Sequence, residues 1–436
     1  MQLYDNMRVL SRRELIPMLG AVALRASPAP DHRIVIAPYT LDLSPRVRIR
    51  TTAYNQQVPG PLFRFTEGRP VTIEVENQSS LPEIVHWHGL FLPPEVDGSM
   101  EEGTPEIAPG KIARYTFTPS PSGFRWFHTH TMAGRDLTRA LYGGQHGFLY
   151  VEPKDGRPGY DSEFFLSLGD WKGMMVASDD GSMNPEYSVS AINGKMFGFG
   201  EPLRVKQGER ALLHILNASA TEAHWIVCAG HQFHVVALDG NPVPRPAPVS
   251  MLRLAPAERV SALIEMANPG VWVLGEVRTH IRDRGMGMVL EYAGRKGNAQ
   301  WLQPESLDWS YARFAGPRQP PSGTPLTLSF NSRFAGHGAP DHWTINGKSF
   351  PKTVPVRLQQ GERYRLRYIN QSSEPHPVHL HRHLFEVSGI LKDTVLVEPK
   401  SEMEVELVAN HPGLSLFHCH QQNHMDMGFM MLFTYV

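Results

Sequence analysis

Histidines at alternating positions are the feature of this 436-residue chain that points most directly to chemistry. Random placement of its 21 histidines would give about one His-x-His pair, whereas the chain contains five. The pairs are His86/His88, His128/His130, His379/His381, His381/His383 and His418/His420. Because residues i and i+2 of a strand point to the same face, each pair presents two imidazoles side by side, which suits the binding of metal ions.

A thiol lies within the last of these pairs, in the segment HCHQQNH. In a strand, His418 and His420 face one side and Cys419 faces the other, toward a different metal. A thiolate with two imidazoles is the ligand set of a blue-copper electron-transfer site. His424 can supply one imidazole, and His376, on a distant predicted strand, is the candidate for the other.

The second cysteine, Cys228, lies in the apolar segment HWIVCAGH. A single disulfide between Cys228 and Cys419 would leave the histidine cluster unexplained. We therefore interpret Cys228 as a small buried hydrophobic residue.

The composition limits the class of protein. A net charge of −1 offers neither the basic excess typical of nucleic-acid binding nor an acidic tail. Charged residues make up only 19% of the chain, which contains 38 glycines and 37 prolines. That mixture is typical of turn-rich all-β proteins.

Three segments repeat one pattern, at residues 54–80, 192–219 and 345–373. Each has an Asn near its start, then a Gly, an Asn nine residues after that Gly, and a Ser two residues later. Between the Gly and the second Asn, apolar residues alternate as in a half-buried strand. We therefore expect an all-β chain of three consecutive β-sandwich domains, at residues 31–155, 156–312 and 313–436.

Aligning the repeats shows that the outer domains share histidines that the middle domain lacks. His379 of the third repeat aligns with His86 of the first and Val227 of the second. His381 aligns with His88 and Ala229 in the same way. Cys419 aligns with Thr129 and Glu276. We expect the middle domain to bind no copper and to act as a spacer that shapes the assembly.

The four histidine motifs, HWHG, HTH, HPVHLH and HCHQQNH, resemble in order and spacing those of three-domain multicopper oxidases of the bacterial laccase-like group. The resemblance extends from about residue 35 to the C-terminus. It implies three cupredoxin-like Greek-key sandwiches, four copper ions per chain, and dioxygen as the electron acceptor.

The same resemblance implies a ligand set for each copper. Type 1 copper would bind His376, Cys419 and His424. Type 2 copper would bind His86 and His379. The type 3 pair would bind His88, His128, His130, His381, His418 and His420. The trinuclear cluster would then lie between the first and third domains, whereas His231 and His383, at equivalent repeat positions, are expected to be structural.

The implied activity is the one-electron oxidation of phenols or aromatic amines at type 1 copper, coupled to four-electron reduction of dioxygen to water. Electrons would pass from Cys419 through the backbone to His418 and His420. The alternative is a cuprous-ion oxidase in copper tolerance. The segments KGMMVASDDGSM and RDRGMGM contain a few methionines but no long Met-rich insertion, which favours the aromatic reductant. Eleven retained ligand positions argue against a copper-free scaffold, and they are too many for a simple electron-transfer cupredoxin or a copper nitrite reductase.

Three positions near the motifs bear on the reduction potential of type 1 copper and on proton delivery. Phe429 occupies the axial position of type 1 copper, often a Met in the family, and a non-coordinating ring should raise the reduction potential. Asp97 matches an acid that assists proton delivery, and we expect a catalytic role for it. A second family acid is replaced by Met425, with Asp426 next to it, which puts the second proton route in doubt.

The N-terminal residues 1–30 are predicted to be a signal segment. Arg12 and Arg13 precede a short apolar run at residues 15–24 that resembles a twin-arginine export signal. That run is too short to span a bilayer, and no other segment is long and apolar enough. We therefore expect an exported, periplasmic protein without stable membrane insertion; the sequence leaves the oligomeric state open.

Overall fold

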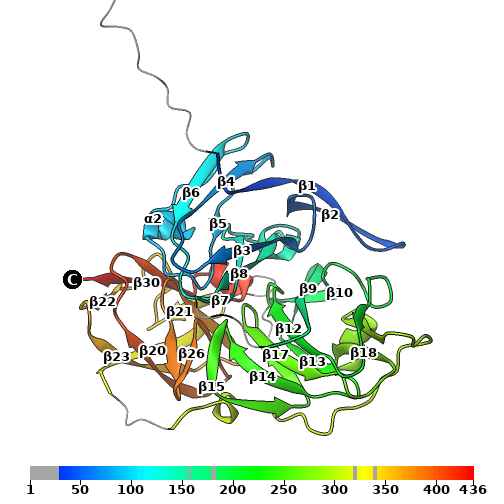
Figure 1. The fold of residues 1–436 in the computed structure, drawn as a ribbon. Coiled ribbons are helices and arrows are strands. Elements are labelled where there is room, and N and C mark those ends of the chain that lie inside the picture. Colours follow the sequence, from blue (N-terminus) through cyan, green and yellow to red (C-terminus); the bar gives the residue numbers. More distant parts are fainter. Residues whose placement is uncertain (1–28, 155, 157–158, 178–182, 318–321, 337–340) are drawn as a thin grey trace, which may run out of the picture.

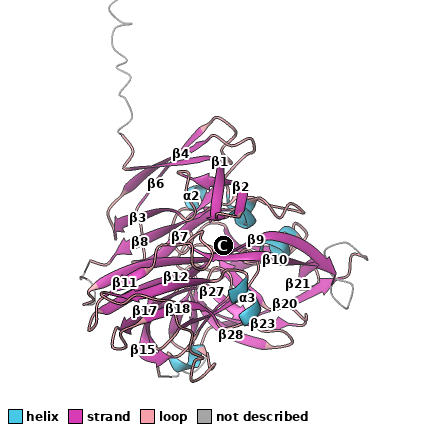
Figure 2. Ribbon diagram, turned by 90° about the vertical axis from the view of Figure 1, so that its right-hand side faces the viewer, coloured by secondary structure: helices cyan, strands magenta, loops and turns pink. Residues whose placement is uncertain are grey.

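Three β-sandwiches make up the molecule, and loops and very short helices connect their strands (Figures 1 and 2). The computed structural model describes residues 29–436 except 155, 157–158, 178–182, 318–321 and 337–340. Strands form 51% and helices 6% of it, so the predicted all-β class with three consecutive sandwiches is confirmed. Arg12, Arg13 and the apolar run of the predicted signal segment lie outside the described residues.

The first sandwich packs a four-stranded sheet, in the order β2-β1-β4-β6, on a second four-stranded sheet, β3-β8-β7-β5. Its strands are β1 (His32–Ser44), β2 (Val47–Tyr54), β3 (Gly60–Thr66), β4 (Val71–Asn77), β5 (Val85–His86), β6 (Ile112–Phe117), β7 (Gly123–Thr129) and β8 (His146–Glu152). Its helices are α2 (Pro94–Asp97), η2 (Met100–Glu102) and η3 (Ala140–Gly143).

The second sandwich has a six-stranded sheet, β10-β9-β12-β17-β14-β15, and a five-stranded sheet, β11-β19-β18-β13-β16. Its strands are β9 (Ser162–Ala177), β10 (Met183–Ile192), β11 (Leu203–Val205), β12 (Arg210–Asn217), β13 (His224–Cys228), β14 (Phe233–Leu238), β15 (Asn241–Val249), β16 (Leu252–Leu254), β17 (Arg259–Glu265), β18 (Val271–Glu276) and β19 (Gly287–Tyr292). Helices α3 (Thr279–Asp283) and η4 (Tyr311–Arg313) accompany it, and Phe314 is buried in its core.

The third sandwich repeats the second, with a six-stranded sheet, β21-β20-β23-β28-β25-β26, and a five-stranded sheet, β22-β30-β29-β24-β27. Its strands are β20 (Thr324–Arg333), β21 (His342–Ile345), β22 (Val356–Leu358), β23 (Arg363–Asn370), β24 (His376–Leu380), β25 (Phe385–Val387), β26 (Ile390–Lys392), β27 (Thr394–Val397), β28 (Glu402–Val408), β29 (Ser415–Cys419) and β30 (Met430–Tyr435). One helix, α4 (Gln422–Asp426), follows β29.

The second Asn of each repeat explains why the pattern recurs. Asn77, Asn217 and Asn370 are buried at the ends of β4, β12 and β23. In every copy the Nδ2 atom donates to two or more backbone carbonyls, and the Oδ1 atom accepts from the backbone N–H of the Ser two residues later. Since buried backbone groups need partners, each Asn satisfies the polar atoms of the loop that leaves its strand.

The sandwiches meet pairwise around a common centre (Figure 1). Strand β7 of the first contacts β17 of the second, helix η2 of the first contacts β29 of the third, and β15 of the second contacts β26 of the third. Arg382, buried between β24 and β25, donates to the Leu92 carbonyl of the first sandwich at 2.7 Å and to carbonyls of the loop before β29. The first and third sandwiches are therefore held together beside the histidine motifs.

No helix among the described residues has both the length and the hydrophobicity needed to cross a bilayer.

Candidate metal centres

The register between β24 and β29 sorts the predicted ligands onto two faces. His379 pairs with His418, and Val378 pairs with Cys419. Directly paired residues of antiparallel strands point to the same side, so His379 and His418 share one face and Cys419 lies on the other. The predicted separation of the thiol from its flanking histidines therefore holds in the structure.

The first group is mononuclear and comprises His376, Cys419 and His424. Cys419 Sγ lies 3.7 Å from His376 Nδ1 and 3.6 Å from His424 Nδ1, and the two Nδ1 atoms are 3.1 Å apart. The other ring nitrogen of His376, Nε2, lies 2.8 Å from Ser372 Oγ, which fixes the ring's orientation. All three side chains are buried within the third sandwich.

Burial sets the protonation of this group. It lowers the pKa of His376 to about 3 and that of His424 well below its ordinary value, so both imidazoles are neutral. It also raises the pKa of the Cys419 thiol above its ordinary value. A thiolate at this position therefore needs a bound cation, because metal binding displaces the thiol proton.

Aromatic rings enclose the mononuclear group. The Trp343 ring lies 3.9 Å from the His424 ring, and the Phe429 ring lies 4.7 Å from the His376 ring. Phe429 is fully buried in the same apolar cluster as Cys419, whereas Met430 packs in a different cluster with Met425. Phe429, and not Met430, therefore shares the apolar cluster of Cys419.

The other eight histidines gather between the first and third sandwiches. Their ring nitrogens form three sets in which all ligand atoms lie within 4.8 Å of one another. The sets are His86, His88 and His379; His88, His128 and His420; and His130, His381 and His418. All eight predicted residues are thus brought together, and three of the four His-x-His pairs are split between different sets.

One nitrogen of these imidazoles is typically held while the other lacks a partner. The Nδ1 atoms of four rings lie 2.7–2.9 Å from backbone carbonyls: His86 with Asp97, His128 with Thr129, His379 with Asp393, and His418 with Cys419. The buried Nε2 atoms of His86, His128, His130 and His379 and the Nδ1 atom of His88 have no hydrogen-bond partner among the described residues.

Such unpartnered nitrogens test whether metal ions fit. Both ring nitrogens of His420 also lack a partner among the described residues, which makes seven such atoms in the cluster. Leaving a buried polar atom without a partner costs about 1–3 kcal/mol, so the cluster would carry a large penalty without a ligand. Burial and mutual repulsion lower the pKa values of His88, His128, His130, His379 and His418 well below the ordinary value, which makes the rings neutral donors. Neutral imidazoles oriented by their second nitrogen suit copper.

Two buried carboxyl groups lie beside this cluster. Asp97 Oδ2 is 2.8 Å from His381 Nδ1 and 3.1 Å from His86 Nδ1, while Asp97 Oδ1 has no partner among the described residues. Glu102 Oε2 lies 3.5 Å from His381 Nδ1. Burial would raise the pKa of Asp97, but the two rings lower it below its ordinary value, whereas burial raises the pKa of Glu102 to about 7.

Glu102 was not among the predicted site residues. It lies on η2, five positions after Asp97, in a Met-Glu-Glu segment that carries no recognisable spacing signal. Its other oxygen accepts from the backbone N–H of Leu416 at 2.5 Å, so the carboxyl joins the first sandwich to the strand that bears Cys419.

Asp426, the acid next to Met425, has another role. Its Oδ2 atom accepts from the backbone N–H groups of Ala133 and Gly134 at 2.8 and 2.7 Å. Met425 packs in a small apolar cluster with Leu416 and Met430. Asp426 therefore joins helix α4 to the loop after the HTH motif.

The histidines expected to be structural have both ring nitrogens occupied. His383 lies 2.9 Å from the His381 carbonyl oxygen and 2.6 Å from the Tyr435 hydroxyl. His231 repeats this arrangement with the Ala229 carbonyl at 2.8 Å and the Tyr292 hydroxyl at 2.7 Å. With both nitrogens of each ring hydrogen-bonded, His231 and His383 have the structural role that the sequence predicts.

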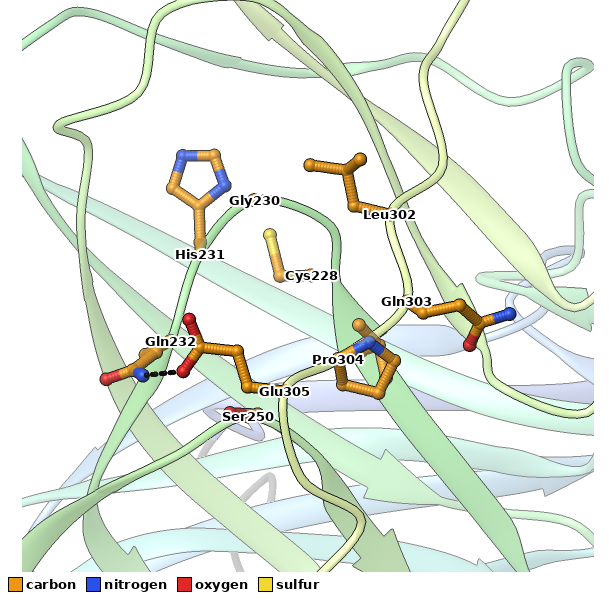
Figure 3. Close-up of a pocket in the computed structure, with 10 residues that line it drawn as sticks. Cys228, Gly230, His231, Gln232, Ser250, Leu302, Gln303, Pro304 and Glu305 are labelled. Carbon is orange, nitrogen blue, oxygen red and sulfur yellow. Dashed lines mark hydrogen bonds between the residues drawn. The ribbon is translucent and has the colours of Figure 1, made fainter.

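Cys228 is fully buried in the core of the second sandwich, as predicted. It borders a cavity of about 230 Å³ that His231, Gln232, Leu302 and Glu305 also line (Figure 3). Burial raises the pKa of the Cys228 thiol to about 12, so it remains protonated. This cavity is lined by none of the predicted copper ligands.

A different cavity, of about 160 Å³, borders helix α4, which carries His424. It is lined by Gly134, Arg135, Leu137, Met175, Met183, Asn423 and Met427. Asn423 immediately precedes His424 in α4, and its buried Oδ1 atom has no hydrogen-bond partner among the described residues. The cavity therefore has a mainly apolar wall and includes the residue that precedes a predicted ligand.

In the other two sandwiches, the positions aligned with His376 and Cys419 are occupied by residues that bond to each other. At the positions of His376 and Cys419 the second sandwich has His224 and Glu276, whose Nδ1 and Oε2 atoms are 3.2 Å apart. The same alignment places Glu83 and Thr129 in the first sandwich, where the hydroxyl donates to the carboxyl at 3.1 Å. Direct polar pairs thus replace ligation there.

Sequence comparison identifies the family. Three family models, each described as multicopper oxidase, match residues 39–156, 162–287 and 323–436. The chain belongs to the multicopper oxidase family. It is therefore an oxidoreductase whose cofactor is copper, four ions being typical, and the buried histidine sets fit such sites.

Individual relatives of this multicopper oxidase span nearly its whole length. It is 29% identical to multicopper oxidase MmcO of Mycobacterium tuberculosis, over 92% of this chain and 86% of that protein. Copper resistance protein A of Pseudomonas syringae pv. tomato is 22% identical, over 94% and 93%. The laccase of Botrytis aclada superimposes with a TM-score of 0.78 at 19% identity, over 92% and 87%. The predicted cupredoxin-like Greek-key fold is confirmed.

Proposed function

We propose that this multicopper oxidase is laccase-like and oxidises phenols or aromatic amines one electron at a time. The observation that carries the proposal is the cavity at helix α4, whose mainly apolar wall includes Asn423, the residue before His424. An aromatic ring fits such a wall, and the side chain of Asn423 would be the hydrogen-bonding group for a phenolic O–H or an aromatic N–H. The reductant would then lie against the helix that carries a copper ligand.

The proposed copper assignments follow the geometric sets. Type 1 copper would be held by His376, Cys419 and His424. Type 2 copper would be held by His86 and His379, with one type 3 copper on His88, His128 and His420 and the other on His130, His381 and His418. When bound, the copper ions supply one-electron acceptance from the reductant and four-electron reduction of dioxygen to water.

The residues between the two groups provide a short covalent route for electrons. Cys419 and His418 are adjacent in β29, and the Cys419 carbonyl accepts a hydrogen bond from His418 Nδ1 at 2.9 Å. The thiol side and the imidazole side of one strand are therefore linked both by the backbone and by this hydrogen bond.

Asp97 and Glu102 would transfer the protons that oxygen reduction consumes. Asp97 accepts hydrogen bonds from two ligand imidazoles and has one free oxygen, so it can orient water and accept or pass a proton. Glu102 Oε2 lies 3.5 Å from His381 Nδ1, the ring nitrogen that would not bind copper, so Glu102 is placed to supply the next proton.

Oxidation of Cu(I) is the second candidate, and one observation favours it. Three methionines, Met175, Met183 and Met427, line the cavity beside His424. Thioethers are soft ligands that select Cu(I) over harder ions. A cuprous ion held there would lie next to the same electron entry point.

Steady-state rates on the fully copper-loaded protein distinguish the two. We expect a higher kcat/KM for a phenol than for Cu(I), and Asn423→Leu should raise the KM for phenol without slowing ferrocyanide, which donates no hydrogen bond. Met175→Leu would slow only Cu(I) oxidation; Met174→Leu is its control, because Met174 is 68% exposed on the opposite face of β9. A higher kcat/KM for Cu(I), lost in Met175→Leu, would favour the second candidate.

We also propose that the protein is exported to the periplasm through its twin-arginine segment. The support is Arg12-Arg13 followed by the apolar run at residues 15–24. Replacing both arginines by lysine should retain the protein in the cytoplasm, and cell fractionation measures this. Undiminished export of the double variant would contradict the proposal.

A further inference from the structure

A buried cluster of charges lies where the three sandwiches meet. Its six members are fully or almost fully buried: Arg125 from the first sandwich, Asp239, Glu258 and Arg259 from the second, and Lys392 and Asp393 from the third. Three positive and three negative charges balance. Buried charges persist only when paired and hydrogen-bonded, so the partners within the cluster are tightly specified.

Arg259 and Asp393 form its most complete pair. The guanidinium of Arg259, at the start of β17, donates to Asp393 Oδ1 at 2.6 Å and to Oδ2 at 2.5 Å. Further hydrogen bonds to the carbonyls of Ala257 and Asp239, both at 3.1 Å, fix the guanidinium in place. Two parallel bonds of this kind specify both distance and angle, which a lysine ammonium cannot do.

Asp393 in turn holds two histidines of the cluster. Its carboxylate Oδ1 lies 3.1 Å from His88 Nε2, and its backbone carbonyl lies 2.7 Å from His379 Nδ1. His88 Nδ1 and His379 Nε2, the opposite ring nitrogens, are the ones without partners. Asp393 therefore determines which nitrogen of each ring is left free for a metal ion.

The HWHG motif itself packs on this pair. Gly89 follows His88 with a φ of +84°, and a Cβ built there would lie 2.5 Å from Asp393 Oδ2 and 3.0 Å from Arg259 Nη2. Only glycine leaves room for this approach, so the backbone of the first copper motif rests directly on the Arg259–Asp393 pair.

We propose that Arg259, from the copper-free second sandwich, is a positioning residue for the trinuclear cluster. It holds the Asp393 carboxylate, and Asp393 orients His88 and His379. The second sandwich is thus part of the oxygen-reducing site although it contributes no ligand. The inference rests on the proposed function through the assignment of these two histidines to copper.

Simple docking of the second sandwich onto the third would explain the same contact, and the chain provides a control for it. Arg253, on β16, forms a bidentate pair with Glu398 at 2.5 and 3.1 Å, also between these two sandwiches. That pair is partly exposed and touches none of the histidine cluster. Arg253→Met therefore weakens docking without touching the ligands.

The test compares Arg259→Met, Arg259→Lys and Arg253→Met with the parent after identical copper loading. Measured are copper per chain, the blue absorption of type 1 copper, the type 2 electron paramagnetic resonance spectrum, and copper retention against a chelator. We expect Arg259→Met to keep the blue absorption but to bind trinuclear copper about 10- to 100-fold more weakly. Arg259→Lys should recover much of the copper while keeping a shifted type 2 spectrum, and Arg253→Met should match the parent.

Several outcomes would overturn the inference. One is an Arg259→Met variant that retains copper against the chelator as well as the parent and has the parent's type 2 spectrum. Another is an equal loss of copper from Arg253→Met, which would leave docking as the explanation. If Arg259→Met does not fold, Arg259→Lys decides, since an unshifted type 2 spectrum contradicts positioning. A parent that fails to bind four copper ions would overturn the proposed function and this inference together, whereas an unaffected Arg259 variant of a loaded parent overturns this inference alone.

Discussion

At the scale of single residues, Cys419 is the point where the two groups of ligands meet. Its Sγ atom faces His376 and His424, while its own carbonyl is bound to His418 on the other face. A substitution of the Cys419 side chain therefore removes the thiol from the mononuclear group and leaves all the histidines unchanged.

Cys419→Ser should abolish the blue thiolate-to-copper absorption and leave the other three copper ions largely bound. A hydroxyl is a poor substitute for a thiolate toward copper, and none of the eight clustered histidines is changed. Absorption spectroscopy and copper analysis measure both effects. A variant that keeps its blue colour would refute the type 1 assignment.

Phe429→Met should lower the type 1 reduction potential. Phe429 is fully buried beside the His376 ring, and a thioether there can approach the copper axially where the phenyl ring cannot coordinate. Redox titration of the blue band measures the shift, and oxidation of high-potential phenols should slow with it. An unchanged potential would mean that residue 429 does not reach the axial position.

Asp97→Asn should keep all four copper ions and the blue band but reduce turnover with dioxygen, by about 100-fold or more if proton transfer becomes limiting. The loss should deepen as the pH rises from about 5 to 8, since fewer other donors stay protonated. Anaerobic reduction of type 1 copper should stay nearly normal.

Glu102 is the acid placed to compensate in that variant, so adding Glu102→Gln should lower turnover further. Asp426→Asn is the matched control, because Asp426 is bound to the Ala133 and Gly134 amides rather than to a cluster histidine. Equal turnover of the Asp97 variant and the parent would reduce Asp97 to a turn residue before Gly98.

At the scale of elements, the same two strands carry different chemistry in each sandwich. In the third, the aligned positions hold His376 and Cys419; in the second, His224 bridges Glu276 and Asp170 through its two nitrogens at 3.2 and 2.9 Å. Burial opposes the charge on His224, but the two carboxylates raise its pKa to about 10. An ion triad thus fills the space of a metal site.

This triad predicts a pH dependence of stability for the metal-free protein. Because the folded-state pKa of about 10 exceeds the unfolded value of about 6.5, the stabilisation is fully present below the lower value and is lost as pH rises toward 10. His224→Asn should lower the free energy of unfolding by about 3–5 kcal/mol at pH 6 and by less at pH 9. Urea titrations at both pH values measure this; an equal effect at both would contradict it.

How far the sequence could predict the site depends on whether a residue belongs to a repeat. The proposed ligands stand in strand motifs with fixed spacing, so alternation and the family resemblance could single out all eleven, and the structure brings their side chains into compact groups. Glu102, Asp393 and Arg259 come from a short helix, a strand connection and the middle sandwich, where no spacing marks them. Their role arises only when the sandwiches dock, which is a property of the tertiary structure.

At the scale of the whole molecule, the eight clustered histidines come equally from the first and the third sandwich. Metal ions bound there would tie the two sandwiches together, in addition to the Arg382 contacts. Ions that bind the folded state alone stabilise it by mass action, so removing copper should lower the temperature of unfolding, which scanning calorimetry can measure.

The division of His-x-His pairs between sets has a consequence for the order in which copper ions bind to the protein. Residues i and i+2 of a strand are about 6.6 Å apart, too far for one ion but suited to two neighbours. In three of the four pairs, one ring belongs to one set and its partner to another. An ion entering one set therefore fixes the strand that serves the next set, and each occupied site should make the following one easier to occupy. Titration of the metal-free Cys419→Ser variant followed by native mass spectrometry should show chains with no or three copper ions and scarcely any with one or two. Partly filled chains would then be short-lived intermediates, and the oxygen-reducing cluster would assemble as one unit.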